Sequence, residues 1–245
     1  MKVWIVWLPN IGKSTLFNAL TKSYAAPAEN FPFCTIEPNI GIVEVRDPRV
    51  DKLTEMSKSQ KKIYAAIEFV DIAWLVKWAG QWEWLGNKFL SHIREVDAIV
   101  QVLRHFSDSD VTHVEGTIDP LRDVDIINTE LIFADLQQID RLLPAMDKKA
   151  KTIKDVLLNQ EYEALVKVRD YLHAGTWLHG VRDTFSPKDH ELLRKYNFLS
   201  MKPIVYAINI WQDYIVRTQE ISAEFLQKLW VACVSVCAKL ESDMI

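Results

Sequence analysis

The sequence has little cysteine, little excess charge and no long apolar segment. Its three cysteines, Cys34, Cys233 and Cys237, are dispersed and lack metal-binding spacing, which argues against a zinc site or a disulfide and favours free thiols in a reducing compartment. No stretch reaches about 18 uncharged apolar residues, and the N-terminus has no separate apolar region followed by a cleavage site. We therefore expect a cytoplasmic protein with no membrane partner.

The net charge of −4 and the pI of about 5.9 exclude a basic surface over the whole protein. Contact with nucleic acid would need a local basic patch, and we expect no DNA partner. With 245 residues, of which 49% are apolar and 25% charged, the chain is long enough for one or two domains that bury a core.

Short runs rich in β-branched residues predict six strands, and helical patterns lie between most of them. The alternation of the two patterns predicts an α/β fold with a mostly parallel sheet flanked by helices. The six runs cover residues 3–6, 40–45, 67–70, 98–103, 203–209 and, more weakly, 231–236.

No strand is predicted between residues 129 and 198, where apolar residues alternate at spacings of four and three. This is a heptad seam, typical of a coiled coil. Pro144 lies within it and is expected to kink or break the helix, because proline removes a helix hydrogen bond. The seam consists of Ile132, Leu136, Ile139, Leu143, Met146, Ala150, Ile153 and Leu157.

Two further helices follow the seam. One covers about 161–173, ends at Gly175 and would pack back on the first as a helical hairpin. The stretch "SPKDHELL" predicts the other, with Ser186 as N-cap, Pro187 at the first helical position and Asp189 in the first turn. We therefore predict a sheet domain over 1–128 and 199–245, interrupted by a helical coiled-coil insertion over 129–198.

The stretch "WLPNIGKST" fits the phosphate-binding pattern G-x-x-x-x-G-K-[ST] at every position but the first, which is Trp7. Gly12 lets the backbone turn its N–H groups toward phosphate oxygens, Lys13 reaches the β- and γ-phosphates, and Ser14 binds Mg²⁺. A strand before the motif and a helix after it supply the required context. Because "GKST" alone is a common chance match, further support is needed.

That support comes from two later stretches. "FVDIAW" ends a strand with Asp71, which is suited to hold Mg²⁺ through water, and "NFPFCTIEPN" supplies Thr35 to complete the metal shell. Taken singly, Asp71 is better explained as a strand-end cap and Thr35 as an ordinary loop residue. Their order and spacing are those of a G domain, so the predicted metal ligands are Ser14, Thr35 and Asp71.

Several long phrases resemble the YchF/Obg-like ATPase family. They are "LPNIGKSTLFNALTK", "NFPFCTIEPNIG", "EFVDIA", "LGNKFLSHIREVDAI", "INTELIFADL", "NFLSMKPIVYAIN" and "VCAKLE". The resemblance implies a P-loop G domain interrupted by a coiled-coil arm, a preference for ATP over GTP, hydrolysis of that nucleotide, and association with ribosomes. The family continues into a C-terminal TGS domain, which we expect to be absent from this sequence.

The family carries glycine at six positions that are tryptophan here. Trp7 and Trp74 matter most, because glycine in these loops permits positive φ and close approach of phosphate. If either position needs a left-handed backbone, tryptophan costs ~1–2 kcal/mol, and the Trp7 indole must turn into the site or against the following helix. Trp78 and Trp82, four residues apart, are explained equally well as a packed helical stripe or as a disrupted loop. The six are Trp4, Trp7, Trp74, Trp78, Trp82 and Trp84.

Many GTPases have a glutamine that orients the attacking water, and here Leu75, directly after Trp74, stands at that position. A hydrophobic residue at this position is what the family resemblance implies. By resemblance, His113 in "DSDVTHVEG" matches a loop histidine proposed to position the water, although a lone loop histidine is more often simply solvated. Asn10 matches the asparagine of potassium-dependent members and is explained equally well as a turn former.

Base choice depends on "INIWQD". A guanine-specific protein would show N-K-x-D, whereas here Asn209 is followed two residues later by Trp211 and then by Gln212, so adenine is favoured. Asp213 keeps GTP open as an alternative. The residues predicted to bind nucleotide are Asn10, Ile11, Gly12, Lys13, Ser14, Thr15, Thr35, Asn209, Gln212 and Ala238.

Two functions remain open from the sequence. One is a Mg²⁺-dependent ATPase or GTPase, with K⁺ as a candidate second cation, for which Gly12, Lys13 and Ser14 argue. The other is a catalytically impaired scaffold that acts through its helical arm, for which the lost glycines argue. Lysines near the arm's tip are suited to meet ribosomal RNA phosphate, although such a run is usually a solvated helix face. They are Lys148, Lys149, Lys151 and Lys154.

Overall fold

The computed structural model describes residues 1–8, 11–21, 39–71, 93–106, 117–153 and 155–244, and the contacts divide them into two compact units. The first unit comprises the described residues up to 71 together with 96–106, 117–120 and 204–244. The second comprises 93–95, 121–153 and 155–203. The extent of the insertion as a domain, 129–198, stays a prediction.

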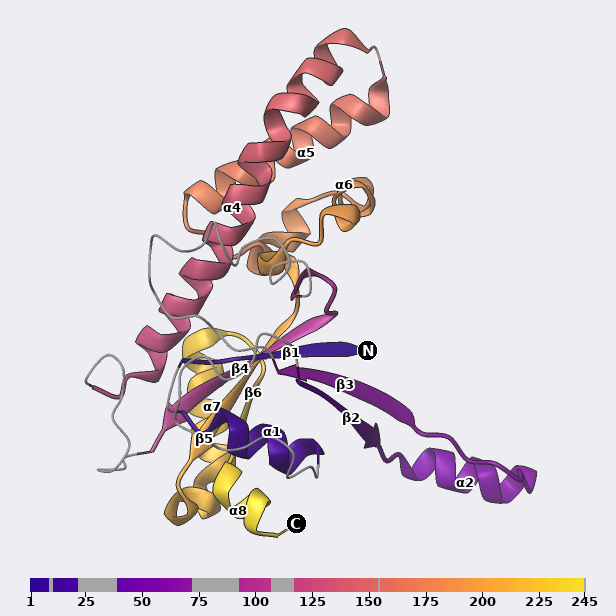
Figure 1. Cartoon of the computed structure of the whole chain (residues 1–245), viewed down its shortest axis with the longest axis vertical. Helices are drawn as coiled ribbons and strands as arrows, with labels where there is room; N and C mark the ends of the chain where they lie inside the picture. Colours follow the sequence, from indigo (N-terminus) through magenta and orange to yellow (C-terminus); the bar gives the residue numbers. More distant parts are fainter. Residues whose placement is uncertain (9–10, 22–38, 72–92, 107–116, 154, 245) are drawn as a thin grey trace. The chain divides into compact units, whose positions relative to one another are not determined.

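A six-stranded sheet of order β2-β3-β1-β4-β5-β6 forms the first unit (Figure 1). β2 pairs antiparallel with β3, and all other neighbours are parallel. The prediction of a mostly parallel α/β sheet is confirmed, and each observed strand overlaps a predicted run. The strands are β1 (Lys2–Val6), β2 (Asn39–Val45), β3 (Ala65–Asp71), β4 (Ala98–His105), β5 (Ile204–Ile210) and β6 (Cys233–Val236).

β1 is the centre of this sheet, between β3 and β4. Its residues Val3 to Val6 are all buried, as expected for a parallel strand that is covered on both faces. Trp4, one of the six tryptophans at family glycine positions, has no exposed surface. It is therefore a core residue of this protein.

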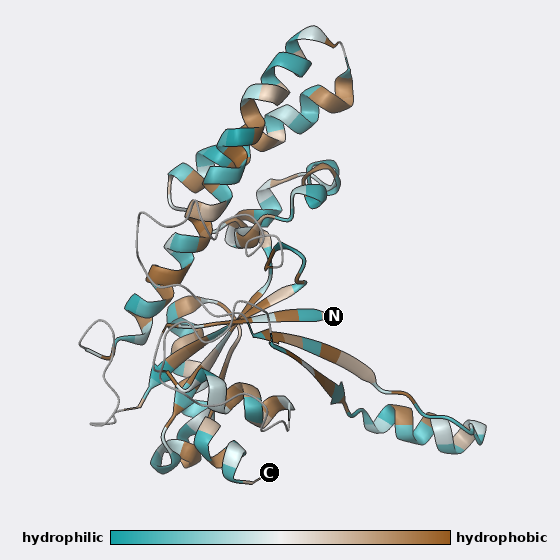
Figure 2. Cartoon of the chain, viewed as in Figure 1, coloured by the Kyte–Doolittle hydropathy of each residue, from teal (hydrophilic) through white to brown (hydrophobic). Residues whose placement is uncertain are grey.

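Four helices complete the described part of the first unit: α1 (Lys13–Thr21), α2 (Pro48–Ser57), α7 (Thr218–Leu229) and α8 (Ala238–Asp243), with a 3-10 helix, η4 (Gln212–Arg217). α1 packs beside α8 and against β2, and α7 packs on β6. α2 begins with Asp47 as N-cap and Pro48 at its first position, and buries no residue. Figure 2 shows apolar residues concentrated in the strands and mixed with polar ones along α2.

The second unit is helical. A long helix, α4 (Pro120–Thr152), is followed by α5 (Val156–His173), η1 (Leu178–Thr184), α6 (Pro187–Leu193), η2 (Arg194–Tyr196) and η3 (Leu199–Met201). Ile139 and Leu143 of α4 pack in one apolar cluster with Leu165 and Val168 of α5. No described helix of the protein is long and apolar enough to span a membrane.

Of the two effects predicted for Pro144, a break of the helix is wrong, because α4 runs through this residue for its full length of 33 residues, and a kink stays a prediction. A proline inside a helix costs about 3 kcal/mol. Here the side chains before and after it, Leu143 and Met146, both pack into the apolar cluster, and their burial offsets that cost. The seam weakens farther on, since Ile153 and Leu157 are each 51% exposed. A coiled coil along the whole seam stays a prediction.

Both helix ends predicted after the seam are confirmed. Gly175, with φ +70°, lies two residues after the end of α5. The N–H groups of Gly175 and Thr176 donate to the carbonyls of Leu172 and Tyr171, respectively, the pattern of a Schellman motif. Ser186 caps α6 through a capping box with Asp189, and Pro187 is at its first position.

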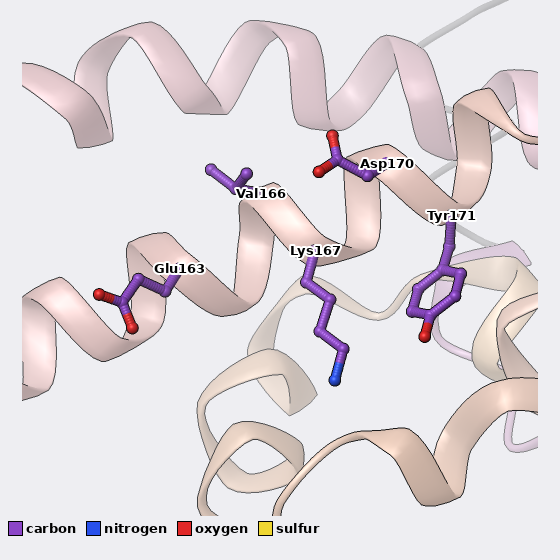
Figure 3. Close-up of a pocket in the computed structure, with 5 residues that line it drawn as sticks. All are labelled: Glu163, Val166, Lys167, Asp170 and Tyr171. Carbon is purple, nitrogen blue, oxygen red and sulfur yellow. The ribbon is translucent and has the colours of Figure 1, made fainter.

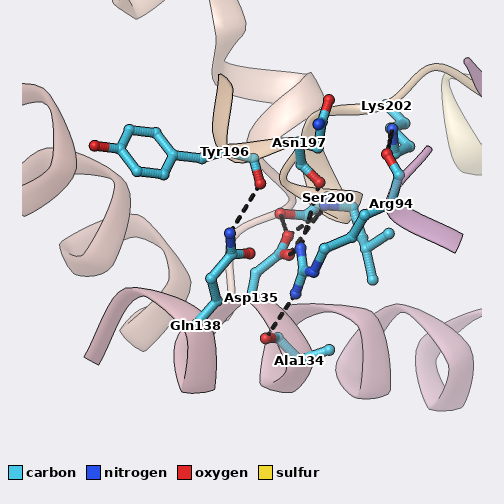
Figure 4. A network of polar contacts seen from close by, with 9 residues as sticks. Arg94, Ala134, Asp135, Gln138, Tyr196, Asn197, Ser200 and Lys202 are labelled. Atoms are coloured by element: carbon cyan, nitrogen blue, oxygen red, sulfur yellow. Dashed lines mark hydrogen bonds and ion pairs between the residues drawn. The ribbon is translucent and has the colours of Figure 1, made fainter. Parts of the chain in front are cut away.

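Asp135 is the polar centre of the second unit. Its carboxylate has no exposed surface and accepts hydrogen bonds from the N–H groups of Leu199 (3.0 Å) and Ser200 (2.8 Å) and from the Ser200 hydroxyl (2.7 Å) (Figure 4). Arg94 Nη1 donates to the same carboxylate at 2.8 Å, and Arg94 Nη2 donates to the Ala134 carbonyl. A single buried charge thus joins three segments that are far apart in the sequence.

We predict that Asp135→Asn lowers the free energy of unfolding of the second unit by about 3–5 kcal/mol. The amide would turn donors toward groups that are themselves donors, and it would leave Arg94 without its buried partner. The control is Asp140→Asn, an exposed carboxylate on the same helix, which should change stability by less than about 0.5 kcal/mol. Urea denaturation followed by far-UV circular dichroism measures both, and equal midpoints for the two variants would contradict the prediction.

Candidate functional site

The candidate site lies where β1 ends and α1 begins. After β1, the next two strands of the chain, β2 and β3, lie on one side of β1 in the sheet, and the following strand, β4, lies on its other side. Such a change of direction opens a crevice at the carboxyl ends of parallel strands, where ligands of α/β proteins bind. The predicted motif residues Gly12, Lys13 and Ser14 lie at this end of the sheet.

Gly12 and Asn209 fit together at the base of the loop. Gly12 has φ +84°, and an added Cβ would lie only 2.5 Å from Nδ2 of Asn209. Nδ2 donates to the carbonyl of Ile11 at 2.9 Å, and Oδ1 accepts from the N–H of Ala238 at 3.1 Å. The buried Asn209 amide at the end of β5 therefore ties the loop after β1 to the start of α8.

Lys13 and Asp71 form the charged centre of the site. Lys13 Nζ donates to both carboxylate oxygens of Asp71, at 2.8 and 2.7 Å, and the Asp71 side chain is only 3% exposed. Burial raises the pKa of Asp71, while the charge and hydrogen bonds of Lys13 and a hydrogen bond from Asn39 act in the opposite direction. Because the ion pair is direct and bidentate, we describe Asp71 as the partner of a cationic Lys13.

Trp7 turns its ring toward this ion pair. Its side chain is buried, and Lys13 Nζ lies 3.8 Å from the centroid of the indole ring, a close cation–π contact. Because Lys13 is both the first residue of α1 and the charged centre of the site, the two positions expected for the indole coincide. Trp7 is not among the described non-glycine residues with positive φ, so the left-handed backbone considered from the sequence is not required here.

The first turn of α1 supplies the remaining motif residues. Gly12 accepts a helical hydrogen bond from the N–H of Leu16 at 3.0 Å, and Ser14 and Thr15 are partly exposed beside it. Free N–H groups at such a helix start face anions. Ser14 and Asp71 together offer hydroxyl and carboxylate oxygens, which suit Mg²⁺. Among the described residues, no three His, Cys, Asp or Glu side chains gather into a metal site.

An aromatic cluster follows β4 and β5 at the same end of the sheet. Phe106 and Trp211 stack with ring centroids 5.9 Å apart, and Lys239 Nζ lies 5.1 Å from the centroid of the Trp211 ring. Gln212 and Asp213, between which the base choice was left open, are both exposed in η4. The sequence analysis did not predict this cluster, and for Trp7 it predicted only that the indole turns into the site or against the following helix. The only signal was an aromatic residue next to each motif.

Several predicted residues lie outside the described part of the chain. They are Asn10, Thr35, Leu75 and His113, together with Cys34, Trp74, Trp78, Trp82, Trp84 and Lys154. Their proposed roles stay predictions.

A shallow hollow of about 380 Å³ lies on α5 (Figure 3). Lys167 and Tyr171 point to the same side of this helix, where the Lys167 amine donates to the Thr184 carbonyl and the Tyr171 hydroxyl to the Thr184 hydroxyl. The hollow contains none of the predicted site residues. It is lined by Glu163, Val166, Lys167, Asp170 and Tyr171.

The P-loop between β1 and α1, the aspartate at the end of β3 and the asparagine at the end of β5 define a P-loop nucleotide-binding protein with the GTPase fold. A family profile described as "50S ribosome-binding GTPase" matches residues 2–129. The chain belongs to the YchF/Obg-like ATPase family within this class, as the following relatives show.

The chain is 43% identical to the "Ribosome-binding ATPase YchF" of Bacillus subtilis over 245 residues, which is 98% of the chain and 66% of that relative. It is 46% identical to "Obg-like ATPase 1" of Caenorhabditis elegans over 216 residues, 88% of the chain and 54% of the relative. The solved YchF GTPase of Schizosaccharomyces pombe superposes with a TM-score of 0.76 at 32% identity, covering 100% of the chain and 67% of that structure. The chain thus spans about two thirds of the length of the Bacillus subtilis relative and about half of the length of the Caenorhabditis elegans relative.

We predict that Gly12→Ala lowers the free energy of unfolding by about 2 kcal/mol or more. The backbone conformation alone costs an L-residue ~1–2 kcal/mol, and the new methyl group would push the Asn209 amide away from Ile11. Gly180→Ala is the control, since an added Cβ there meets nothing within 4 Å. Urea denaturation compares the two, and equal stability would mean that Asn209 does not hold the loop closely.

Proposed function

We propose that this chain is the nucleotide-binding part of a ribosome-associated ATPase that prefers ATP to GTP. The observation that carries the proposal is the Lys13–Asp71 ion pair at the end of β1 and β3, with Lys13 opening α1. A lysine and an aspartate in this relation are what a P-loop protein needs to hold phosphate and metal. The family membership supports the same activity.

The proposed chemistry assigns one task to each residue. The N–H groups at the start of α1 and the Lys13 amine would hold the β- and γ-phosphates. Ser14, Asp71 and Thr35 would hold Mg²⁺, which neutralises charge on the phosphates when it is bound. Asn209 keeps the loop in place through Ile11 and Ala238.

Hydrolysis needs a positioned water molecule. His113 is proposed to orient that water, and Leu75 to stand in the family's hydrophobic position next to it. Asn10 is proposed to help place K⁺ near the phosphates, where a cation would balance developing negative charge.

Base selection is proposed to rest on Gln212. It is exposed in η4, three residues after Asn209, and its amide offers both a donor and an acceptor, as the adenine edge requires. The Asn209 amide is already engaged on both sides by the chain itself, so it is less suited to read the base directly. In the GTP alternative, the carboxylate of Asp213, in the same exposed segment, would bind the guanine base.

Association with ribosomes is proposed for the helical unit. Lys148, Lys149 and Lys151 are exposed near the C-terminal end of α4, and Lys151 pairs with Asp147 in the same helix. The relatives from Bacillus subtilis and other bacteria are named ribosome-binding ATPases. Clustered lysines bind nucleic acid phosphates through counterion release.

One observation favours a second candidate, a scaffold with impaired turnover. The Trp7 ring lies against Lys13 in the place where a glycine would leave room for phosphate. If the ring stays there, the chain would act through its helical arm alone. Nucleotide binding remains the better supported proposal, because Gly12, Lys13 and Asp71 are all in place.

We predict that Lys13→Ala reduces the affinity for Mg²⁺-ATP by about 100-fold or more, since it removes charge-assisted hydrogen bonds to phosphate worth ~1.5–3 kcal/mol each. Titration with a fluorescent ATP analogue measures this. Lys58→Ala, which removes an exposed lysine after α2, should leave the affinity unchanged. Equal binding by Lys13→Ala and the parent would refute the P-loop assignment.

We predict that changing Lys148, Lys149 and Lys151 to Gln weakens cosedimentation with ribosomes. The slope of log affinity against log salt concentration should decrease in magnitude by about two to three, because each lost phosphate contact removes ~0.7–0.9 from it. The control changes Lys52, Lys58 and Lys61, an equal number of exposed lysines in and after α2. An unchanged slope in the first variant would place the ribosome contact elsewhere.

A further inference from the structure

Lys13 is fully occupied before any nucleotide arrives. Its ammonium group donates to both oxygens of Asp71, at 2.8 and 2.7 Å, and faces the Trp7 ring at 3.8 Å. The Lys13 side chain is only 15% exposed. The amine that the proposed function assigns to phosphate is therefore held inside the protein by two partners.

We propose that Trp7, Lys13 and Asp71 form an autoinhibitory latch that opens only when phosphate and Mg²⁺ arrive together. This inference rests on the proposed function, because it concerns how the same site is controlled. Phosphate oxygens would give Lys13 new acceptors in place of Asp71, and the released Asp71 carboxylate would then be available to hold Mg²⁺. The nucleotide and the metal thus bind as one exchange.

Burial makes the exchange all-or-none. If a free triphosphate drew Lys13 away, the Asp71 carboxylate, 3% exposed, would be left as an unpaired charge in a poorly solvated place. It would also face the negative charge of the incoming phosphates. A bound Mg²⁺ would supply positive charge against both penalties, so the latch should discriminate strongly against nucleotide without metal.

Trp7 contributes to the latch in a different way. Its ring attracts the ammonium group through the cation–π contact and keeps water from it. This attraction opposes every phosphate ligand, whether or not metal is present. The two partners of Lys13 therefore have separable effects: Asp71 sets the dependence on Mg²⁺, and Trp7 lowers affinity equally in both conditions.

The test uses the full chain and a fluorescent ATP analogue, titrated once with Mg²⁺ and once with EDTA. For Asp71→Asn we expect an affinity in EDTA about tenfold or more above that of the parent, since Lys13 is no longer neutralised. Loss of a metal ligand alone would leave the EDTA affinity unchanged. Asp140→Asn, on the exposed face of α4, is the matched control.

For Trp7→Gly we expect affinity to rise about tenfold both with Mg²⁺ and with EDTA, so that the ratio of the two dissociation constants stays within about threefold of the parent's. Trp230→Gly is the matched control, because Trp230 is 88% exposed and distant in sequence from the motif. It should bind like the parent.

A second measurement needs no nucleotide. Lys13→Met, Asp71→Asn and the double variant are unfolded in urea, and the double variant should lose less stability than the two single variants together. The latch would be overturned if the two losses of stability were additive. It would also be overturned if neither Asp71→Asn nor Trp7→Gly raised the affinity in EDTA. The proposed function would still stand in that case, provided that the parent binds the nucleotide and Lys13→Ala abolishes this binding. Failure of the parent and of Trp7→Gly alike to bind in Mg²⁺ would instead overturn the proposed function, and the latch with it.

Discussion

The buried amide of Asn209 is the contact on which the phosphate site depends. It donates to Ile11, accepts from Ala238 and lies so close to Gly12 that no side chain fits there. A side-chain amide can bind in two directions at once, so one residue at the end of β5 fixes two loops that meet there. The Asn209 amide therefore ties the residues just before Lys13 to the start of α8.

The tryptophan at the first motif position acts through its side chain rather than through its backbone. Trp7 keeps an ordinary backbone conformation, and its ring occupies space beside Lys13 that a glycine would leave open. Trp4 is accommodated in the core of β1 without any exposed surface. The same replacement therefore has different consequences at two positions three residues apart, because one faces the packed interior and the other faces the ligand site.

Local patterns were sufficient for most of the fold. The strands were found because β-branched runs that are buried on both faces leave a clear signal, and the caps at Gly175 and Ser186 because turn chemistry is local. The helix does not break at Pro144, because its neighbour Leu143 in α4 packs in one apolar cluster with Leu165 and Val168 of α5. The residues around the proline do not indicate that a segment distant in the sequence will bury them.

The sequence by itself determined the class of protein, because Gly12, Lys13 and Ser14 stand between a strand and a helix, Asp71 ends a later strand, and long phrases around them resemble one family. Tertiary structure alone decided what these residues do in the empty site. The pairing of Lys13 with Asp71 and its contact with Trp7 bring together the start of α1 and the ends of β1 and β3. Directions of side chains in space are set by packing, and no spacing along the chain encodes them.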